Sequence, residues 1–353
     1  MLDFGAMPTR TTALVLFLIA SLPLPASAQT TKVFIDQDTS GPGGTDSMSI
    51  AMLLKAPNIE VVGIGVVAGD AWLDQAIYHT LKIAEVSGKP DVPIAAGAAE
   101  PLLQTGESMK MRHALWGPKP GDGWYGNWGE RVPPSGTIRP APGGPPKGKP
   151  LEKHAAELLI EMARKYPGEL VLYTAGPMTN VALAVKLAPD IVSKIKKVYT
   201  MGGAIQVNEK FNFWWDAEAA GIHMRTPWNE KELTPIDVCH KTKMKQAFVD
   251  EIARAGTPLA RYVQESYAEH DDELLNFMWD ELAAAAIIDP SIITETVDLF
   301  VDVDWSWGPN YGKTAWWRPE QGGPSWAKKA WRVQTDIDLQ KFEKLYLELM
   351  TRP

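Results

Sequence analysis

Residues Val33–Asp38, VFIDQD, are followed after Thr39 by Ser40–Asp46, SGPGGTD. An apolar strand here delivers two carboxylates, a glycine-rich loop turns the chain, and a third carboxylate opens a helix over 47–54. In an open α/β sheet, the residues at the carboxyl end of a strand lie where ligands bind. The strand–loop–helix order therefore predicts that this loop borders a ligand site.

The three carboxylates of this stretch are candidate metal ligands. Asp36 and Asp38 lie two residues apart, so we expect both on one side of the strand, with Asp46 converging from the helix start. Close carboxylates repel one another unless protons or a cation intervene, and calcium prefers oxygen ligands. The pattern favours a metal site at the strand end. A polar loop with a helix-capping aspartate is the alternative that the pattern leaves open.

The first 28 residues have the pattern of a processing signal. Arg10 precedes the apolar run 13–20, which ends near an Ala-x-Ala site at 26–28. This run is too short to span a bilayer, and no later run is long enough. We expect a secretory signal peptide over 1–28 and an exported mature protein, periplasmic or secreted, with no membrane partner.

The net charge limits the classes of partner, and the cysteine content excludes an internal disulfide. The net charge is −8, and removing Asp3 and Arg10 with the signal leaves it unchanged. A chain this acidic is a poor partner for nucleic acid or for an anionic membrane. Cys239 is the only cysteine, so no internal disulfide can form and stability must come from a large core.

Strand and helix patterns alternate on both sides of one interruption. The near-continuous apolar run 59–67 suits a strand buried on both faces of a parallel sheet. The alternation predicts a doubly wound, mostly parallel α/β sheet with helices on both faces. The expected elements are helix 71–87, strand 92–97, helix 151–165, strand 170–173, helix 178–187 and strand 197–201.

Residues 109–150 form the interruption. They are rich in Trp, Gly and Pro, which fits either a disordered excursion or a functional lid. Because strands and helices alternate in the same way before and after this segment, we expect a single domain over 29–353. The C-terminal third should be mostly helical up to residue 288 with a strand at 297–303, and 237–239 resembles a strand end.

Further polar groups fall at strand ends or helix starts. The segment 174–180, TAGPMTN, follows one strand and opens a helix, and Asp70 follows another strand by two residues. Asn212 lies between aromatic residues, and Asp280 opens an apolar helix at 282–288. Such positions can meet at the carboxyl edge of one sheet.

Taken in order, these motifs resemble the calcium-dependent nucleoside hydrolase family, whose members split ribonucleosides into ribose and base. The resemblance runs from about Val33 to the strand after Pro290, and more weakly through 312–314. It rests on the aspartate cluster, the Gly-Pro-x-Thr-Asn turn, Met-Gly-Gly-Ala at 201–204, the Asn-aromatic-Trp-Asp-x-Glu-Ala segment, and Trp-Asp at 279–280. It implies a nucleoside hydrolase-like fold and an N-glycosyl hydrolase.

The resemblance also implies a metal site. The Ca²⁺ ligands would be the side chains of Asp38, Asp46 and Asp280 and the main-chain carbonyl of Ala175. Asp36 would be either a direct ligand or a neighbour that fixes the site. Asp38 would accept a proton from the attacking water that calcium holds, since a metal lowers the pKa of water and a nearby carboxylate can take the proton.

Sugar contacts follow from the resemblance as well. Asn212 and Asn208 would bind ribose hydroxyls, with Asp70 and Met201 lining the pocket. Thr45 stands where the family carries a carboxylate for a ribose hydroxyl, so it would supply a weaker neutral bond.

Two further positions concern the substrate. Lys210 stands where a ribose-binding glutamate is expected. Trp279 resembles the purine-preferring branch, in which aromatic rings stack on the base, and Trp116, Trp124 and Trp128 are candidates for the opposite face.

We therefore expect calcium-dependent hydrolysis of a ribonucleoside, purine rather than pyrimidine. One alternative is hydrolysis of a different N-ribosyl or glycosyl compound, which a substrate panel would reveal. The other is a non-catalytic, calcium-stabilised binding protein, which turnover dependent on Asp38 would exclude. We expect the tryptophans from Trp305 onward either to pack within the fold or to form an oligomer surface. The sequence therefore leaves open whether the protein is a homo-oligomer.

Overall fold

The computed structural model describes residues 1, 3, 30–118, 123–207, 211–269 and 277–353. Nearly all of the predicted signal peptide lies outside these residues, as do Asn208 and Lys210, so their roles stay predictions. In the described part of the chain, no helix is both long and apolar enough to cross a membrane.

Nine strands form one sheet in the order β3-β2-β1-β4-β5-β6-β9-β7-β8. Neighbours from β3 through β9 pair in parallel, and β7 pairs antiparallel with both β9 and β8. The predicted doubly wound, mostly parallel sheet is confirmed. The strands are β1 (Thr31–Gln37), β2 (Ile59–Val66), β3 (Ile94–Ala96), β4 (Val171–Thr174), β5 (Lys197–Met201), β6 (Lys231–Thr234), β7 (Ile293–Val303), β8 (Thr314–Trp317) and β9 (Trp331–Ile337).

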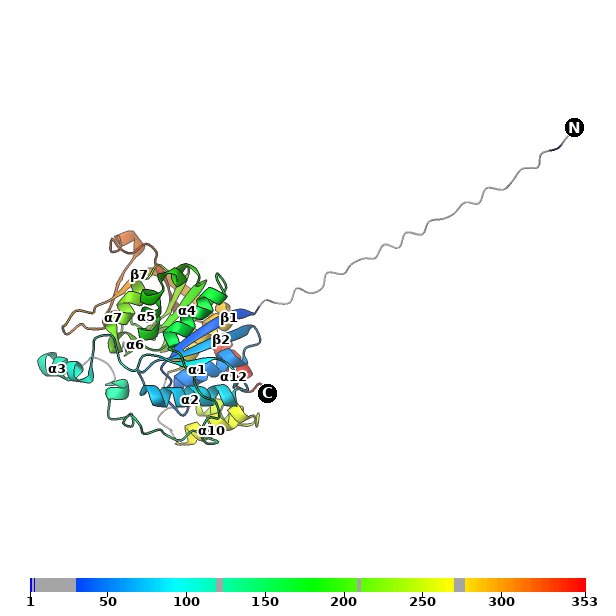
Figure 1. Ribbon diagram of the computed structural model, residues 1–353, viewed down its shortest axis with the longest axis horizontal. Helices are drawn as coiled ribbons and strands as arrows, with labels where there is room; N and C mark the ends of the chain where they lie inside the picture. Colours follow the sequence, from blue (N-terminus) through cyan, green and yellow to red (C-terminus); the bar gives the residue numbers. More distant parts are fainter. Residues whose placement is uncertain (2, 4–29, 119–122, 208–210, 270–276) are drawn as a thin grey trace.

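Helices cover both faces of this sheet (Figure 1). One layer contains α1 (Gly44–Lys55), α2 (Leu73–Val86), α11 (Trp279–Ile288) and α12 (Leu339–Met350), and the other contains α4 (Ala155–Lys165), α5 (Thr179–Leu187) and α7 (Ala217–Arg225). Alternate residues of β1 serve the two cores: Ile35 packs with the α1 layer and Phe34 with the α4 layer.

The remaining helices lie around these layers. They are α3 (Gly106–Trp116), α6 (Phe211–Trp215), α8 (Ile236–Cys239), α9 (Gln246–Ala253) and α10 (Pro258–Glu269), with short 3-10 turns at η1 (Gly126–Trp128), η2 (Pro189–Ser193), η4 (Pro290–Ile292) and η5 (Pro319–Gln321).

The C-terminal half departs from the sequence prediction. β6, β8, β9 and α12 were not expected, and residues 237–239 belong to helix α8 rather than to a strand end. β6 begins with Lys231 and Glu232, both buried, and Glu232 forms an ion pair with Lys197 at 2.7 Å. Because β6 carries charged residues, it lacks the apolar run by which a buried strand is predicted. The strands that pair with it, β5 and β9, come from distant parts of the chain.

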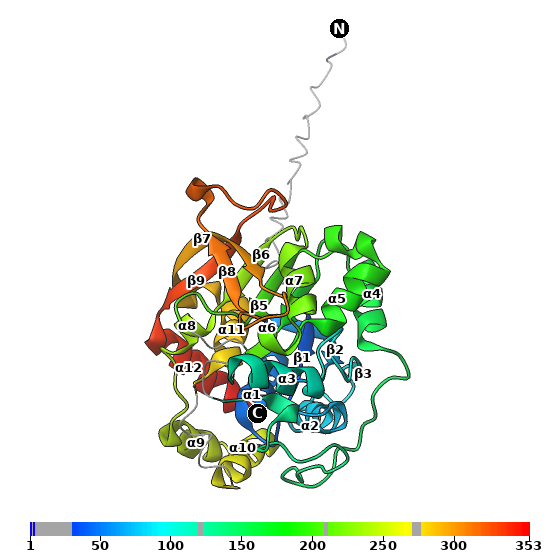
Figure 2. The ribbon, with the colours of Figure 1, turned by 90° about the vertical axis from the view of Figure 1, so that its left-hand side faces the viewer.

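The Trp/Gly/Pro-rich excursion is held against α2 (Figure 2). Nε2 of Gln75 donates to the carbonyl oxygens of Pro133 at 3.0 Å and Thr137 at 2.8 Å. Oδ2 of Asp74 accepts from the amide of Gly136 at 2.9 Å. The disordered alternative is therefore wrong for the described part of this segment.

The order of the sheet reverses beside β1. β2 and β3 lie on one side of β1, and β4, β5 and β6 lie on the other. At such a switch point the loops that follow the two strands lead to opposite faces and leave a crevice. Asp38 follows β1 and Ala175 follows β4, so the fold places both at this crevice.

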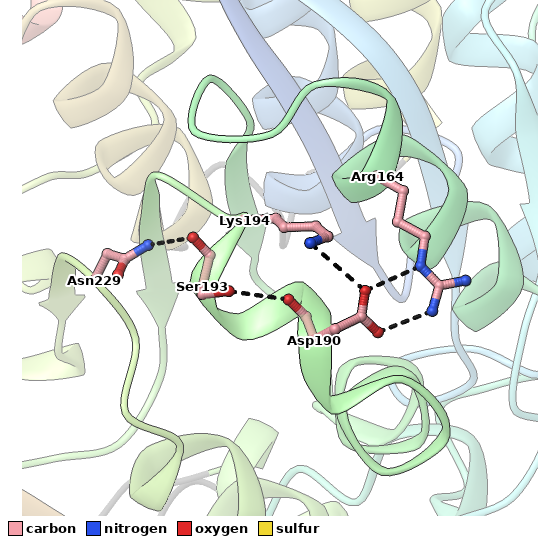
Figure 3. A network of polar contacts seen from close by, with 5 residues as sticks. All are labelled: Arg164, Asp190, Ser193, Lys194 and Asn229. Carbon is pink, nitrogen blue, oxygen red and sulfur yellow. Dashed lines mark hydrogen bonds and ion pairs between the residues drawn. The ribbon is translucent and has the colours of Figure 1, made fainter.

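The opposite, amino edge of the sheet holds exposed ion pairs (Figure 3). Asp190 accepts from Nη2 of Arg164 at 2.8 Å and lies 3.8 Å from Nζ of Lys194. Beside them, Nδ2 of Asn229 donates to the carbonyl of Ser193 at 3.0 Å. These contacts join the segments that lead into β5 and β6.

Candidate metal and active site

Three carboxylates meet where β1 ends. Asp38, Asp46 and Asp70 each offer one oxygen, and these oxygens all lie within 4.8 Å of one another. Asp38 and Asp46 are 1 % and 2 % exposed, and Asp70 is half-buried. The crevice at the switch point thus contains three like charges in close contact.

Backbone and hydroxyl donors fix these oxygens in place. Oδ2 of Asp38 accepts from the amide of Asp70 at 2.8 Å, and Oδ2 of Asp46 accepts from both the amide and the hydroxyl of Ser40 at 2.7 Å. A Cβ atom at Gly69 would lie 2.2 Å from Oδ2 of Asp38, so only glycine fits there. These contacts orient the carboxylates without supplying a positive charge.

Asp280 joins the group from the start of α11. Its carboxyl group is hydrogen-bonded to that of Asp46, and its Oδ2 accepts from Nε2 of Gln37 at 2.8 Å. Two carboxyl groups in contact need a shared proton or a cation. The sequence analysis missed Gln37, although strand alternation places it on the same face as Ile35 and α11.

Burial raises the pKa of these carboxyl groups above the usual range. It is the largest cause for Asp38, Asp46 and Asp280, and the negative charges of Asp70 and Asp46 raise the pKa of Asp38 further. A set of donors made entirely of oxygen, buried and mutually repelling, fits a hard divalent cation such as Ca²⁺.

Asp36 lies apart from this group. Its Oδ1 accepts from Nδ2 of Asn180 at 2.8 Å, whereas Oδ2 has no hydrogen-bond partner among the described residues. Burial raises the pKa of Asp36 to about 7. The expected convergence with Asp38 is wrong because β1 ends before Asp38, so strand alternation does not reach it, and Asp70 takes the third place. A direct metal contact by Asp36 stays a prediction.

Asn212, which the sequence predicts to bind ribose, is hydrogen-bonded to the carbonyl of Ala175, the predicted metal ligand. Nδ2 of Asn212, in α6, donates to the carbonyl oxygen of Ala175 at 2.5 Å and to that of Met201 at 3.2 Å. This amide therefore links the carboxyl ends of β4 and β5. Binding of ribose by Asn212 and lining of the pocket by Met201 stay predictions.

Thr45 is hydrogen-bonded to two residues of α11. Its hydroxyl donates to Oε2 of Glu281 and accepts from the amide of Asp280 at 2.9 Å. A hydroxyl has a single proton, so donation to a sugar would break the bond to Glu281. The sequence analysis missed Glu281, a carboxylate only 2 % exposed, because it follows Asp280 in what looks like an ordinary helix start.

Among the three tryptophans of the excursion, Trp124 reaches the site. Its Nε1 donates to Oδ1 of Asp70. Trp128 instead stacks on Trp215 with ring centroids 5.4 Å apart, and Trp116 is 43 % exposed. Of the three, Trp124 contacts the carboxylate cluster, and stacking of any of them on a base stays a prediction.

Trp279 is half-buried at the first position of α11. Its ring centroid lies 5.8 Å from that of Phe277, and its carbonyl oxygen accepts from Sγ of Cys239 at 3.6 Å. It precedes Asp280 directly, so its backbone is anchored beside the cluster. Stacking of Trp279 on a base stays a prediction.

Comparisons with known proteins identify relatives of this chain. The family model for inosine-uridine preferring nucleoside hydrolases matches residues 33–344. Probable uridine nucleosidase 2 of Arabidopsis thaliana is 32 % identical over 66 % of this chain and 67 % of its own. The inosine-uridine preferring nucleoside hydrolase of Leishmania major is 27 % identical over 91 % and 98 %. A solved purine-preferring ribonucleoside hydrolase from Gardnerella vaginalis shares the fold, with a TM-score of 0.71 and 22 % identity over 91 % and 98 % of the two chains.

Proposed function

The chain belongs to the inosine-uridine preferring nucleoside hydrolase family and is thus an enzyme that hydrolyses N-glycosidic bonds, and we propose that it cleaves ribonucleosides with Ca²⁺. The observation that supports the metal is the meeting of Asp38, Asp46 and Asp70 at the switch point of the sheet. The substrate is a small nucleoside, and the products are ribose and free base.

Asp38 and Asp46 would hold the cation, with Asp280, Asp70 and the Ala175 carbonyl as the further oxygen donors nearby. When bound, the cation offsets the repulsion among these groups and lowers the pKa of water. Asp38 takes the proton from the attacking water. Its carboxylate suits this role because the Asp70 amide fixes one oxygen and because burial already raises its proton affinity.

The same carboxylates stabilise the sugar during cleavage. Positive charge develops on the ribosyl group as the bond to the base breaks. Carboxylates already fixed by Ser40 and by the Asp70 amide face that charge without reorganising, which favours the transition state over the bound substrate.

We propose a purine as the departing base. The Trp124 ring reaches the cluster through its hydrogen bond to Asp70, and Trp279 directly precedes Asp280 in the chain. Stacking on indole would raise the basicity of the leaving purine. The relatives named uridine nucleosidases make a pyrimidine the alternative. In the test, Trp279→Ala lowers the rate on purine nucleosides more than on p-nitrophenyl riboside. An equal loss on both would remove the stacking proposal.

The decisive experiment measures reducing-sugar release from a panel of purine and pyrimidine nucleosides, first with calcium and then with a chelator. Ribose release that stops with the chelator supports the proposal and ranks the bases. No release from any nucleoside, with calcium still bound, would favour a binding protein or a different glycosyl substrate. We further propose that the mature enzyme is exported, which cell fractionation tests.

A further inference from the structure

A pocket that is partly open to solvent adjoins the carboxylate cluster. Asp70 belongs both to the cluster and to the cavity wall. A substrate whose sugar lies at the cluster therefore has this space for a group that extends beyond the sugar. The wall also includes the glycine loop 40–44, His79, Trp124, Arg131 and Arg139.

The excursion brings two arginines to this cavity in an otherwise acidic chain. Arg131 and Arg139 are both exposed, and Nη2 of Arg139 donates to the carbonyl of Arg131 at 2.8 Å. Within the described ranges, no carboxylate forms an ion pair with either guanidinium. A guanidinium offers only donors, in a geometry that suits carbonyl, carboxylate and phosphate oxygens.

A buried histidine adds an unsatisfied polar atom to the same wall. His79 is 1 % exposed, and its Nδ1 has no hydrogen-bond partner among the described residues. Its ring packs so closely on the loop that a Cβ atom at Gly41 would lie 2.7 Å from Nδ1. Buried polar atoms are nearly always bonded, so an orphaned one beside a cavity indicates a missing partner. Burial and the charge of Arg139 lower the pKa of His79 to about 4, which leaves the ring neutral near pH 7.

The start of α1 contributes donors of the same kind. Gly43 caps this 12-residue helix without a side-chain hydrogen bond to its first turn. The first amides of a helix favour negative or acceptor groups. The helix start and the two arginines line one space, and the unbonded Nδ1 of His79 is buried against Gly41 in the same wall.

We propose that this cavity binds an acceptor-rich group of the substrate through Arg131 and Arg139. The inference rests on the proposed function, because it concerns the part of a nucleoside that lies beyond the sugar. Two groups share the chemistry: the carbonyl edge of the base, as in hypoxanthine, and a phosphate on the sugar. Adenosine carries neither a base carbonyl nor a phosphate, so it should gain less from the arginines than the other two substrates.

The test compares Arg131→Gln and Arg139→Gln with the wild-type enzyme on paired substrates. Inosine against adenosine isolates the base carbonyl, and adenosine 5′-monophosphate against adenosine isolates the phosphate. We expect each variant to lower kcat/KM for one acceptor-rich substrate roughly tenfold or more, while adenosine stays within about twofold. The control is Arg164→Gln, which removes the same charge at the opposite edge of the sheet.

Selective loss on inosine assigns the cavity to the base, and selective loss on the monophosphate assigns it to phosphate. Equal changes on all three substrates, or no change in either variant, overturn the proposal. Calorimetric titration of the full chain with hypoxanthine and with inorganic phosphate needs no turnover. Binding that weakens in the cavity variants but not in Arg164→Gln upholds the cavity even if no nucleoside is hydrolysed, in which case the proposed function alone fails.

Discussion

The two edges of the sheet use aspartates in opposite ways. At the carboxyl edge, Asp38 and Asp46 are buried beside other carboxylates, and their pKa values are raised. At the amino edge, Asp190 is exposed between Arg164 and Lys194, and hydrogen bonding to Arg164 lowers its pKa (Figure 3). One edge concentrates charge of a single sign away from water, and the other pairs opposite charges in water.

The buried cluster indicates a functional site, whereas the exposed ion pairs are ordinary surface contacts. Exposed ion pairs contribute little to stability, because water screens them and side-chain order opposes them. A buried group of like charges destabilises the fold unless a ligand compensates it, so its presence points to a binding or catalytic role.

Removing the carboxylate of Asp38 should have the largest effect. Asp38→Asn keeps the shape but loses the proton acceptor and a metal ligand, so kcat should fall at least about 1,000-fold. Without calcium, the variant should melt no lower than the wild type, because one repelling charge is gone. Nucleoside hydrolysis and thermal melting by circular dichroism check both expectations, and a wild-type rate would refute the mechanism.

Calcium should stabilise the protein by binding only the folded cluster. At a concentration about 100-fold above Kd the gain is roughly 2.7 kcal/mol, which corresponds to about 4 °C in Tm for a chain of this size. Melting curves with calcium and with chelator measure the shift. Asp38→Asn should abolish most of it, whereas Asp190→Asn should retain it in full. A calcium shift of the same size in both variants would place the metal elsewhere.

The calcium-free protein should lose stability as the pH rises. Burial raises the pKa of Asp36 to about 7, from the ordinary 3.8, and raises those of Asp38, Asp46 and Asp280 as well. The folded state therefore binds more protons than the unfolded state in this range. Its extra stability is fully present below about pH 4 and is lost as the pH rises through about 7.

Urea unfolding at pH 5 and pH 8 in chelator measures this loss, which should reach a few kcal/mol. Saturating calcium should reduce it, since calcium competes with protons for the same carboxylates and binds better at higher pH. The amino edge works in the opposite direction, because a lowered pKa at Asp190 costs stability only when the pH falls. Identical pH slopes with and without calcium would contradict the assignment.

The smallest effect belongs to the amino edge. Asp190→Asn removes an exposed ion pair, so Tm should change by no more than about 1 °C and kcat by less than about twofold. Melting and hydrolysis assays on the purified variant check this. A loss of activity comparable to that of Asp38→Asn would break the contrast between the two edges.

Local sequence patterns predicted the framework of this site well. The strand, the glycine loop and the helix that carry Asp38 and Asp46 follow one another directly between residues 31 and 55, and near-neighbours along a chain have few alternative arrangements. The apolar run of β2 likewise indicated a buried parallel strand. By contrast, β6 begins with Lys231 and Glu232, whose burial depends on partners that no local window contains.

The sequence by itself determined the alternation of strands and helices and placed carboxylates at strand ends, because periodicity and turn chemistry act over a few residues. Only the tertiary structure decided which groups meet. It brought Asp70 rather than Asp36 to Asp38, hydrogen-bonded Thr45 to Glu281, and placed Arg131 and the glycine loop around the same pocket. These contacts join segments far apart in the chain, and they follow from strand order and helix packing, which no single stretch of residues specifies.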